Sequence, residues 1–166
     1  MRPKLKGKLL FMCGKMAAGK STLSKELSER EDAVLLVLDD YLERLYPGQI
    51  VDVASFITYS TRIRDALAPH VCSLLSMGIS VVLDFPGNTR KQRNWFRQLY
   101  QQAGSEHELH FIEASDDVCK RQLRERSRDL PPGTRWTTEA DFDAITAYFE
   151  PPAADEGFNV VKHERA

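Results

Sequence analysis

The feature that most constrains this chain is the segment GKMAAGKS at residues 14–21, which fits the pattern G-x-x-x-x-G-K-[ST]. An apolar run at residues 8–13 comes directly before it, as expected of a strand buried on both faces of a parallel sheet. Residues 21–30 follow, with Leu23 and Leu27 spaced as on one buried face of a helix. A strand, a glycine-rich turn and a helix in this order form the setting in which the pattern binds phosphate. We therefore expect an α/β domain that holds a nucleoside triphosphate.

Each part of this turn has an expected role in binding ATP and Mg²⁺. Its backbone N–H groups would surround the β-phosphate at the start of the helix, where the helix dipole favours negative charge. Lys20, a predicted catalytic residue, would bridge the β- and γ-phosphates, and the hydroxyl of Ser21 would bind Mg²⁺. A glycine turn that matches the pattern by chance is the alternative, and the flanking strand and helix argue against it. The predicted ATP-binding residues are Gly14, Lys15, Met16, Ala17, Ala18, Gly19, Lys20, Ser21 and Thr22.

Apolar runs and helical patterns alternate along the rest of the chain. Strands are predicted at residues 33–38, 79–83, 109–112 and 158–161, and helices at residues 52–77, 89–102, 118–128 and 139–149. Pro69 lies inside the first of these helices and is expected to kink or divide it. The alternation predicts one three-layer α/β domain over residues 1–166, with right-handed crossovers between parallel strands.

The composition argues against several classes of function. The formal net charge of −1 gives the whole chain no attraction to nucleic acid or anionic lipid. No stretch approaches the roughly 18 apolar residues that cross a bilayer, and the apolar run after the basic start is too short for a signal peptide. We therefore expect a cytoplasmic protein with no membrane partner, and find no indication of its oligomeric state. The three cysteines lack the spacing of a metal or redox pair and are expected to be reduced.

Carboxylates end the second and third predicted strands, at the sheet edge where ligands of open α/β folds bind. Asp39 and Asp40 follow the second strand, and one of them could take the proton of an attacking acceptor hydroxyl. The alternative for this pair is a solvated cap of residues 41–45. Asp84 follows the run VVL in the manner of a carboxylate that holds Mg²⁺ or its bound water, and its alternative role is to form the turn before Pro86.

Polar residues after the third strand are candidates for binding the acceptor. Asn88, Arg90 and Arg93 lie at the start of a predicted helix, where amide and guanidinium groups could hold an anionic acceptor. A charged helix face is more often only solvated, which is the alternative for the two arginines. The predicted acceptor-site residues are therefore Asp39, Asp40, Asn88, Arg90 and Arg93.

Several arginines precede a break in the chain at the Pro-Pro-Gly of residues 131–133. A movable segment at this break would bring one or two guanidinium groups over the phosphates, as a lid over residues 121–138. The arginines of the preceding helix are Arg121, Arg124, Arg126 and Arg128. Helical spacing puts Arg126 away from the face of the other three, so they cannot all reach one phosphate. Arg124 and Arg126 are the predicted catalytic arginines, and solvation is the alternative for the others.

Together, these residues resemble those of the small P-loop kinases that include polynucleotide kinase, zeta toxin and chloramphenicol phosphotransferase. The resemblance covers nearly the whole chain and implies a parallel five-stranded sheet in the order 2-3-1-4-5, with helices on both faces and an arginine-bearing lid. It also implies that Asp39, the first carboxylate after the second strand, is the general base. This chain departs from the pattern of the group at two places, and both bear on the acceptor. Polynucleotide kinases usually carry Arg where this chain has Leu38, and residues 84–88 read DFPGN where the group often has Asp and then Thr-Asn.

Three functions fit these features. The leading hypothesis is a kinase that moves the γ-phosphate of ATP to a hydroxyl of a small molecule, with Asp39 as the base and an arginine of the lid beside the transferring group. A polynucleotide 5′-hydroxyl kinase is the first alternative. It would need basic residues that lead a nucleic acid to the carboxylates, and the only candidates for these lie at residues 90–93. The second alternative is an ATP-dependent switch, which would order a loop for a partner without phosphorylating an acceptor.

Overall fold

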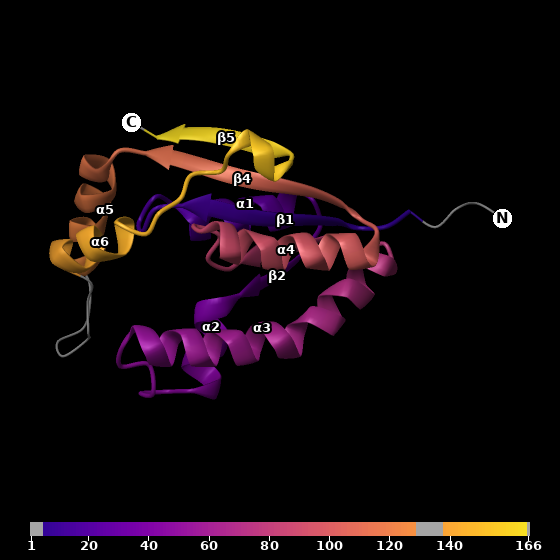
Figure 1. Ribbon diagram of the computed structural model, residues 1–166, viewed down its shortest axis with the longest axis horizontal. Coiled ribbons are helices and arrows are strands. Elements are labelled where there is room, and N and C mark those ends of the chain that lie inside the picture. The colour runs from indigo at the N-terminus through magenta and orange to yellow at the C-terminus, as the bar shows by residue number, and fades with distance from the viewer. Residues whose placement is uncertain (1–4, 129–137, 166) are drawn as a thin grey trace.

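The computed structural model describes residues 5–128 and 138–165, which form a five-stranded parallel sheet between two layers of helices (Figure 1). The strands are β1 (Lys8–Gly14), β2 (Val34–Val37), β3 (Val81–Asp84), β4 (Glu106–Ala114) and β5 (Val160–Arg165). Their order is β2-β3-β1-β4-β5, and every neighbouring pair is parallel. The predicted fold class and strand order are confirmed.

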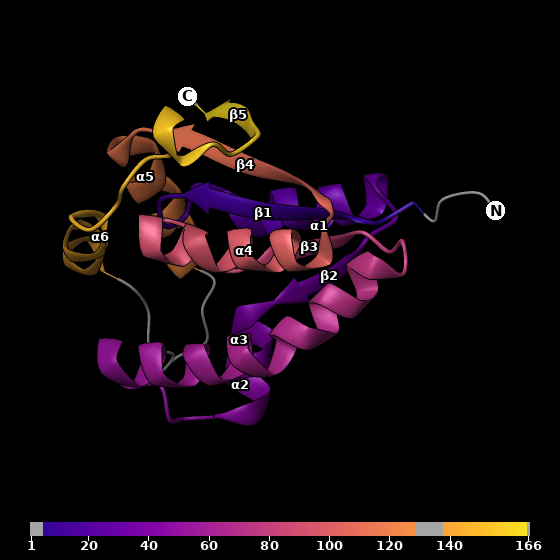
Figure 2. The ribbon, with the colours of Figure 1, turned by 45° about the vertical axis from the view of Figure 1, so that its right-hand side comes forward.

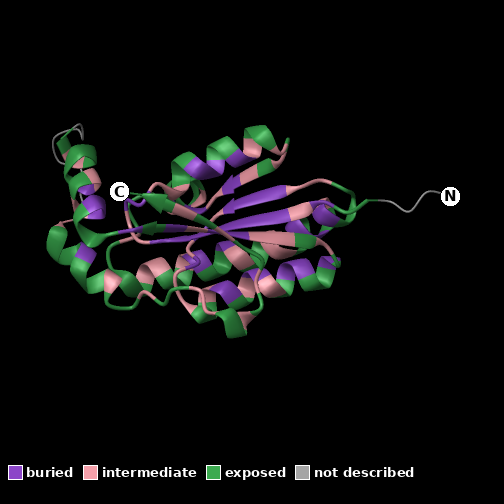
Figure 3. Ribbon diagram, turned by 90° about the horizontal axis from the view of Figure 1, so that it is seen from above, coloured by how far each residue is buried: buried purple, intermediate pink, exposed green. Residues whose placement is uncertain are grey.

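Six α-helices and one short 3₁₀ helix lie between the strands of the described residues. They are α1 (Lys20–Arg30), α2 (Leu38–Leu45), α3 (Val53–Ser76), α4 (Arg90–Ala103), α5 (Asp116–Arg128), α6 (Glu139–Thr146) and the 3₁₀ helix η1 (Ala154–Glu156). Side chains of α2, α3 and α4 pack on one face of the sheet, and those of α1 and α5 pack on the other. Figure 3 shows the buried strands between these two helical layers. None of the helices described is both long and apolar enough to cross a bilayer.

β1 is the central strand, and its side chains at residues 9–13 are fully buried. Alternate residues of a strand point to opposite faces, so the odd-numbered residues of this run enter one core and the even-numbered residues enter the other. In the first core, Phe11 stacks on Phe96 of α4 with ring centroids 4.5 Å apart. The loop at residues 14–21 therefore starts from a strand that is packed on both faces.

The strands point their carboxyl ends toward one edge of the sheet, where the loop after β1 also lies. Figure 2 shows α5 and α6 beyond the arrowheads of β1 and β4, at this same edge. Ligands of open parallel sheets bind outside the carboxyl ends of the strands. α5, which carries the arginines of the predicted lid, thus lies on the side of the sheet that carries the candidate site.

The region after β2 differs from the prediction. β2 ends at Val37 and α2 begins at Leu38, so Asp39 and Asp40 lie in the first turn of a helix rather than at the end of a strand. Leu38 and Leu42 are both buried, because residues four apart share one face of a helix. An acidic first turn also suits the positive end of the helix dipole.

Other elements differ from the prediction mainly in length. β4 starts at Glu106 and has nine residues, β5 starts at Val160, and α6 ends at Thr146. α3 runs for 24 residues through Pro69 without being divided, and Figure 1 shows it bending along its length, as a proline that removes a hydrogen bond would cause. Of the predicted lid, residues 129–137 lie outside the described residues.

Two histidines join β4 to β5 on the face covered by α1. Nδ1 of His110 lies 2.9 Å from Nε2 of His163, and His110 is 1% exposed. Burial is the main cause that lowers the pKa of both imidazoles. The carboxylate of Glu108 lies 3.6 Å from Nε2 of His110 and opposes this effect, because its negative charge raises the pKa of that imidazole. Both side chains are therefore favoured in their neutral form in the folded protein.

We expect the free energy of unfolding to fall as the pH is lowered through about 6.5, the pKa of an unfolded histidine. Below that pH the unfolded state binds more protons than the folded state, until the lower folded pKa values are passed. Urea unfolding between about pH 8 and pH 5 tests this. The double variant His110→Gln with His163→Gln should lose less stability over this range than the wild type, and parallel curves for the two proteins would contradict the prediction.

Candidate active site

The predicted phosphate loop leaves β1 at Gly14 and enters α1 at Lys20. Gly19, the N-cap of α1, has a φ of 106°, and Ala17 has a φ of 61°. Only glycine adopts the first of these angles without strain, which explains the glycine at this position. No side chain caps the start of α1. The backbone N–H groups of a helix start are the donors that bind phosphate in such loops.

Lys20 reaches back over the loop from the first turn of α1. Its ammonium group donates a hydrogen bond to the carbonyl oxygen of Gly14 and lies 3.5 Å from that of Lys15. Burial lowers the pKa of Lys20, and the negative charges of Asp84 and Asp39 oppose this effect. A cation is thus held against the loop, where a bound triphosphate would need its charge neutralised.

Ser21 and Asp84 come together from α1 and β3. The Ser21 hydroxyl donates a hydrogen bond of 2.8 Å to Oδ2 of Asp84. Both side chains offer hard oxygen atoms, which Mg²⁺ prefers, and Mg²⁺ usually keeps several waters. Across the described residues, no group of three or more His, Cys, Asp or Glu side chains could hold a metal ion. The pair fits a Mg²⁺ ion whose other ligands come from phosphate and water.

Asp39 belongs to α2 but lies within electrostatic range of the phosphate loop. Its side chain is exposed to solvent, yet partial desolvation raises its pKa, and the charges of Asp84 and Asp40 add to this. The positive charges of Lys20 and Arg126 oppose these effects, because they lower the pKa of Asp39. Arg126 is on α5, the helix that carries the arginines of the predicted lid. A carboxylate with a raised pKa is a stronger base than an ordinary aspartate and suits proton transfer.

Asn88 fixes the first residue of the phosphate loop. Its Oδ1 accepts a hydrogen bond of 2.9 Å from the backbone N–H of Gly14. The backbone of Asn88 is held in turn, because its N–H donates to Gln92 and its carbonyl accepts from the N–H of Glu150, each at 2.8 Å. Asn88 was expected to contact an acceptor, whereas its amide oxygen here positions the phosphate loop.

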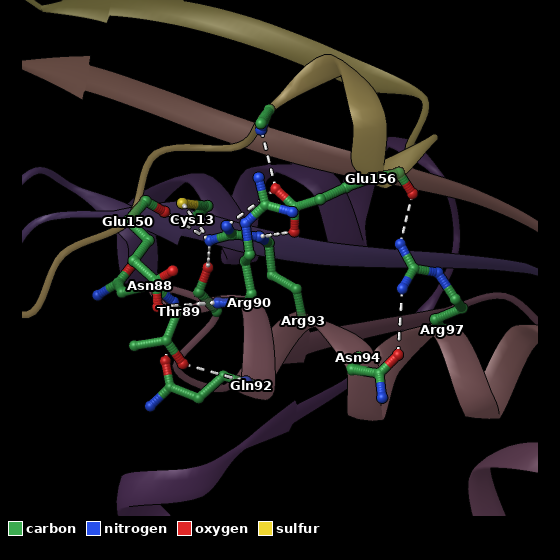
Figure 4. Close-up of polar contacts among 12 residues, drawn as sticks. Cys13, Asn88, Thr89, Arg90, Gln92, Arg93, Asn94, Arg97, Glu150 and Glu156 are labelled. Atoms are coloured by element: carbon green, nitrogen blue, oxygen red, sulfur yellow. Dashed lines mark hydrogen bonds and ion pairs between the residues drawn. The ribbon is translucent and has the colours of Figure 1, made fainter.

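The prediction that Arg93 offers a surface guanidinium to an acceptor is wrong. Arg93 is fully buried, and it pairs with Glu156 through Nε to Oε1 at 2.8 Å and Nη2 to Oε2 at 3.0 Å. Its Nη1 donates to the carbonyl oxygens of Gly87 at 3.1 Å and Glu150 at 2.8 Å, as Figure 4 shows. The spacing of Arg93 from the buried Phe96 matches one helix face, and this signal in the sequence already indicated burial.

The other predicted arginines have different surroundings. Arg90 forms a two-point ion pair with Asp155 at 3.0 and 3.1 Å, and Arg124 pairs with Glu139 at the start of α6. Both arginines are therefore engaged in exposed ion pairs. Arg126 is exposed and forms no ion pair with another residue of the described ranges. Of the two predicted lid arginines, Arg126 is the one whose charge acts on Asp39.

Cys13 lies at the base of the phosphate loop and is fully buried. Burial raises the pKa of its thiol to about 11, against the opposing charges of Arg93 and Lys20. The thiol is therefore protonated at neutral pH and has no nucleophilic role. Cys72 and Cys119 are also buried and free.

A comparison with models of known protein families shows to which family this chain belongs. The sequence model of the AAA_33 family, an AAA domain, matches residues 9–152, which is most of the chain. The protein belongs to this family. The match runs from β1 to the segment after α6 and includes the phosphate loop, Asp39, Asp84, α5 and α6. Among proteins with curated descriptions, none matches the sequence.

Solved structures share the fold of this AAA_33 protein at low sequence identity. A proposed kinase from Chloroflexus aurantiacus j-10-fl has a TM-score of 0.74 and 19% identity, over 98% of this chain and 87% of that chain. The APS kinase CysC of Mycobacterium tuberculosis, in complex with AMPPNP and APS, has a TM-score of 0.63 and 16% identity over 98% and 91%. A gluconokinase from Sinorhizobium meliloti 1021 has a TM-score of 0.60 and 15% identity over 99% and 86%. These likenesses show that the chain shares its fold with these three proteins.

The ion pair of Arg93 gives a stability prediction with a matched control. Replacing Glu156 by Gln leaves a buried guanidinium without its counter-charge and should lower the free energy of unfolding by about 3 kcal/mol or more. Replacing the neighbouring Asp155 by Asn removes only an exposed pair and should lower the free energy of unfolding much less. Urea unfolding of the two variants beside the wild type measures both. Equal small losses would show that the buried pair does not stabilise the fold.

Proposed function

We propose that this protein is an ATP-dependent kinase that transfers the γ-phosphate to a hydroxyl group of a small-molecule acceptor. The observation that carries the proposal is the position of Asp39, an exposed carboxylate within electrostatic range of Lys20 and Asp84. Phosphoryl transfer needs a base for the acceptor hydroxyl close to the groups that bind the phosphates and the metal. These three groups meet that need at one edge of the sheet.

In the proposed reaction, the loop at residues 14–21 binds the triphosphate and Lys20 offsets the charge of its β- and γ-phosphates. The acceptor oxygen attacks the γ-phosphorus while the bond to the β–γ bridging oxygen breaks, and Asp39 takes the hydroxyl proton as ADP leaves. Mg²⁺, held by Ser21 and by Asp84 directly or through water, would neutralise phosphate charge when bound. Arg126 is the favoured lid residue for steadying the transferring group.

Two considerations favour a small acceptor over the end of a nucleic acid. The net charge of the chain is −1, and of the three basic side chains at residues 90–93, Arg90 and Arg93 are already paired with Asp155 and Glu156. That leaves Lys91 as the remaining candidate of this track for phosphate contacts, whereas nucleic-acid binding depends on several such contacts. Two of the proteins that share the fold are a gluconokinase and an APS kinase, both named for small substrates.

The test is a transfer assay with γ-labelled ATP, a cell metabolite extract and hydroxyl-ended oligonucleotides. Labelled small molecules are expected. Label on oligonucleotides would favour the polynucleotide kinase, and label only in free phosphate would favour the ATP-dependent switch. A Lys20→Ala variant serves as the control for phosphate binding and should lose both ATP binding and transfer.

The same assay tests the proposed base. Replacing Asp39 by Asn should lower the rate of transfer about a hundredfold or more, because the variant cannot accept the proton, and should leave ATP binding largely intact. Replacing Glu43 by Gln removes a carboxylate one turn further along α2 and should change the rate less than about twofold. A transfer rate in the Asp39 variant equal to that of the Glu43 variant would remove Asp39 as the base.

A further inference from the structure

Arg64, on α3, is a half-buried arginine that forms no ion pair with a carboxylate of the described residues. Its Cζ lies 5.7 Å from the centroid of the Trp95 ring on α4, and its Nη2 donates a hydrogen bond of 3.3 Å to Oγ1 of Thr61. Burial lowers the pKa of Arg64, and the negative charge of the neighbouring Asp65 opposes this effect. These contacts hold the guanidinium group in place but leave its charge without a paired carboxylate.

One turn earlier on the same face of α3 lies Ser60, which is 4% exposed. Its hydroxyl has no hydrogen-bond partner among the described residues. Long side chains of a helix lean back over the preceding turn, and the hydrogen bond from Arg64 to Thr61 shows this direction. Because buried polar groups in folded proteins nearly always have a partner, an unpaired hydroxyl beside an unpaired guanidinium group indicates a binding site for an anion.

These two side chains belong to the helical layer beside the proposed acceptor site. α3 begins on the side toward which the strands point and ends before β3 (Figure 2). It packs against α2, which carries the proposed base Asp39, and against α4. The Trp95 ring that Arg64 contacts stacks on Phe85 with centroids 5.6 Å apart, and Phe85 directly follows Asp84. The guanidinium group therefore lies beside the segment that carries the proposed metal-binding carboxylate.

The other charges of this edge explain why an anionic acceptor would need such a cation. Carboxylates stand at residues 39, 40 and 84, and they repel an anion. Arg90 and Arg93 were expected to hold an anionic acceptor, but both are paired with carboxylates of their own. The N–H groups of Arg64 remain available, and a guanidinium group matches the two oxygen atoms of a carboxylate or phosphate.

From these contacts, and resting on the proposed function, we infer that the phosphoryl acceptor carries an oxyanion, such as a carboxylate, which Arg64 binds with the Ser60 hydroxyl as a second donor. The Trp95 ring supports the guanidinium group, whose N–H groups then point to the anion. Neither side chain takes part in the transfer itself. Both therefore act on the affinity for the acceptor, and their loss raises KM more than it lowers kcat.

The first experiment asks which class of molecule is phosphorylated. A cell metabolite extract is separated on an anion-exchange resin, and each fraction is offered to the wild type with γ-labelled ATP and Mg²⁺. We expect labelled products from the retained, anionic fraction. Label from the unretained fraction alone would overturn the inference and leave the kinase intact, whereas no labelled product from either fraction would refute the proposed function itself.

The second experiment measures transfer by variants over a dilution series of the retained fraction. Arg62→Ala is the matched control, because Arg62 is an exposed arginine of the same helix that lies over the ring of Tyr59 at 5.4 Å. Arg64→Ala should raise the amount of fraction needed for half-maximal transfer about tenfold or more, and Ser60→Ala about threefold. Arg64→Lys should restore only part of the loss, since an ammonium group cannot bind two oxygen atoms side by side. Arg62→Ala should resemble the wild type.

Urea unfolding separates binding from a purely structural role. Ser60→Ala removes a hydroxyl without a partner, so it should weaken the use of the acceptor without lowering the free energy of unfolding. Equal half-saturation in Arg64→Ala and Arg62→Ala would overturn the inference. A loss in Arg64→Ala that falls on the saturated rate alone would overturn it as well, because Arg64 would then not bind the acceptor in its ground state.

Discussion

The buried charge of Arg93 determines how the segments around it are arranged, because a guanidinium removed from water needs acceptors for its N–H groups. Those acceptors are the carbonyl oxygens of Gly87 and Glu150 and the carboxylate of Glu156. The last two lie 57 and 63 residues away in the sequence. Folding must bring these segments together before the charge can be buried. Once gathered, they hold the turn that carries Asn88 and, through it, the start of the phosphate loop.

The candidate site is divided by β1 into two halves of different character. Toward β3 and β2 lie carboxylates, which suit a metal ion and a proton acceptor. Toward β4 and β5 lies the guanidinium group of Arg165, whose Nη2 would be 3.4 Å from a Cβ atom placed on Gly19. Lys20 lies between them in the loop. An anionic ligand that carries a divalent cation fits this distribution, because the positive groups of the loop meet its charge and the carboxylates meet the metal.

Local patterns in the sequence predicted the phosphate loop, because the strand, turn and helix of such a loop are contiguous, whereas the strand order followed only from the resemblance to the small P-loop kinases. The run VLLVL of residues 34–38 did not reveal that the strand ends and a helix begins inside it, since an apolar run fits both. Arg93 finds its partner Glu156 63 residues away, and the approach of Arg165 to Gly19 depends on the pairing of β5 with β4. Contacts over such distances in the chain have no local signal.

The three buried thiols have a use that is independent of catalysis. Cys13 lies beneath the phosphate loop, Cys72 lies in the layer of α3, and Cys119 lies in the layer of α5. An alkylating reagent in solution reaches a buried thiol only when the surrounding layer opens. The order in which the three react would therefore report which layer separates from the sheet first, and the native chain carries these reporters without added labels.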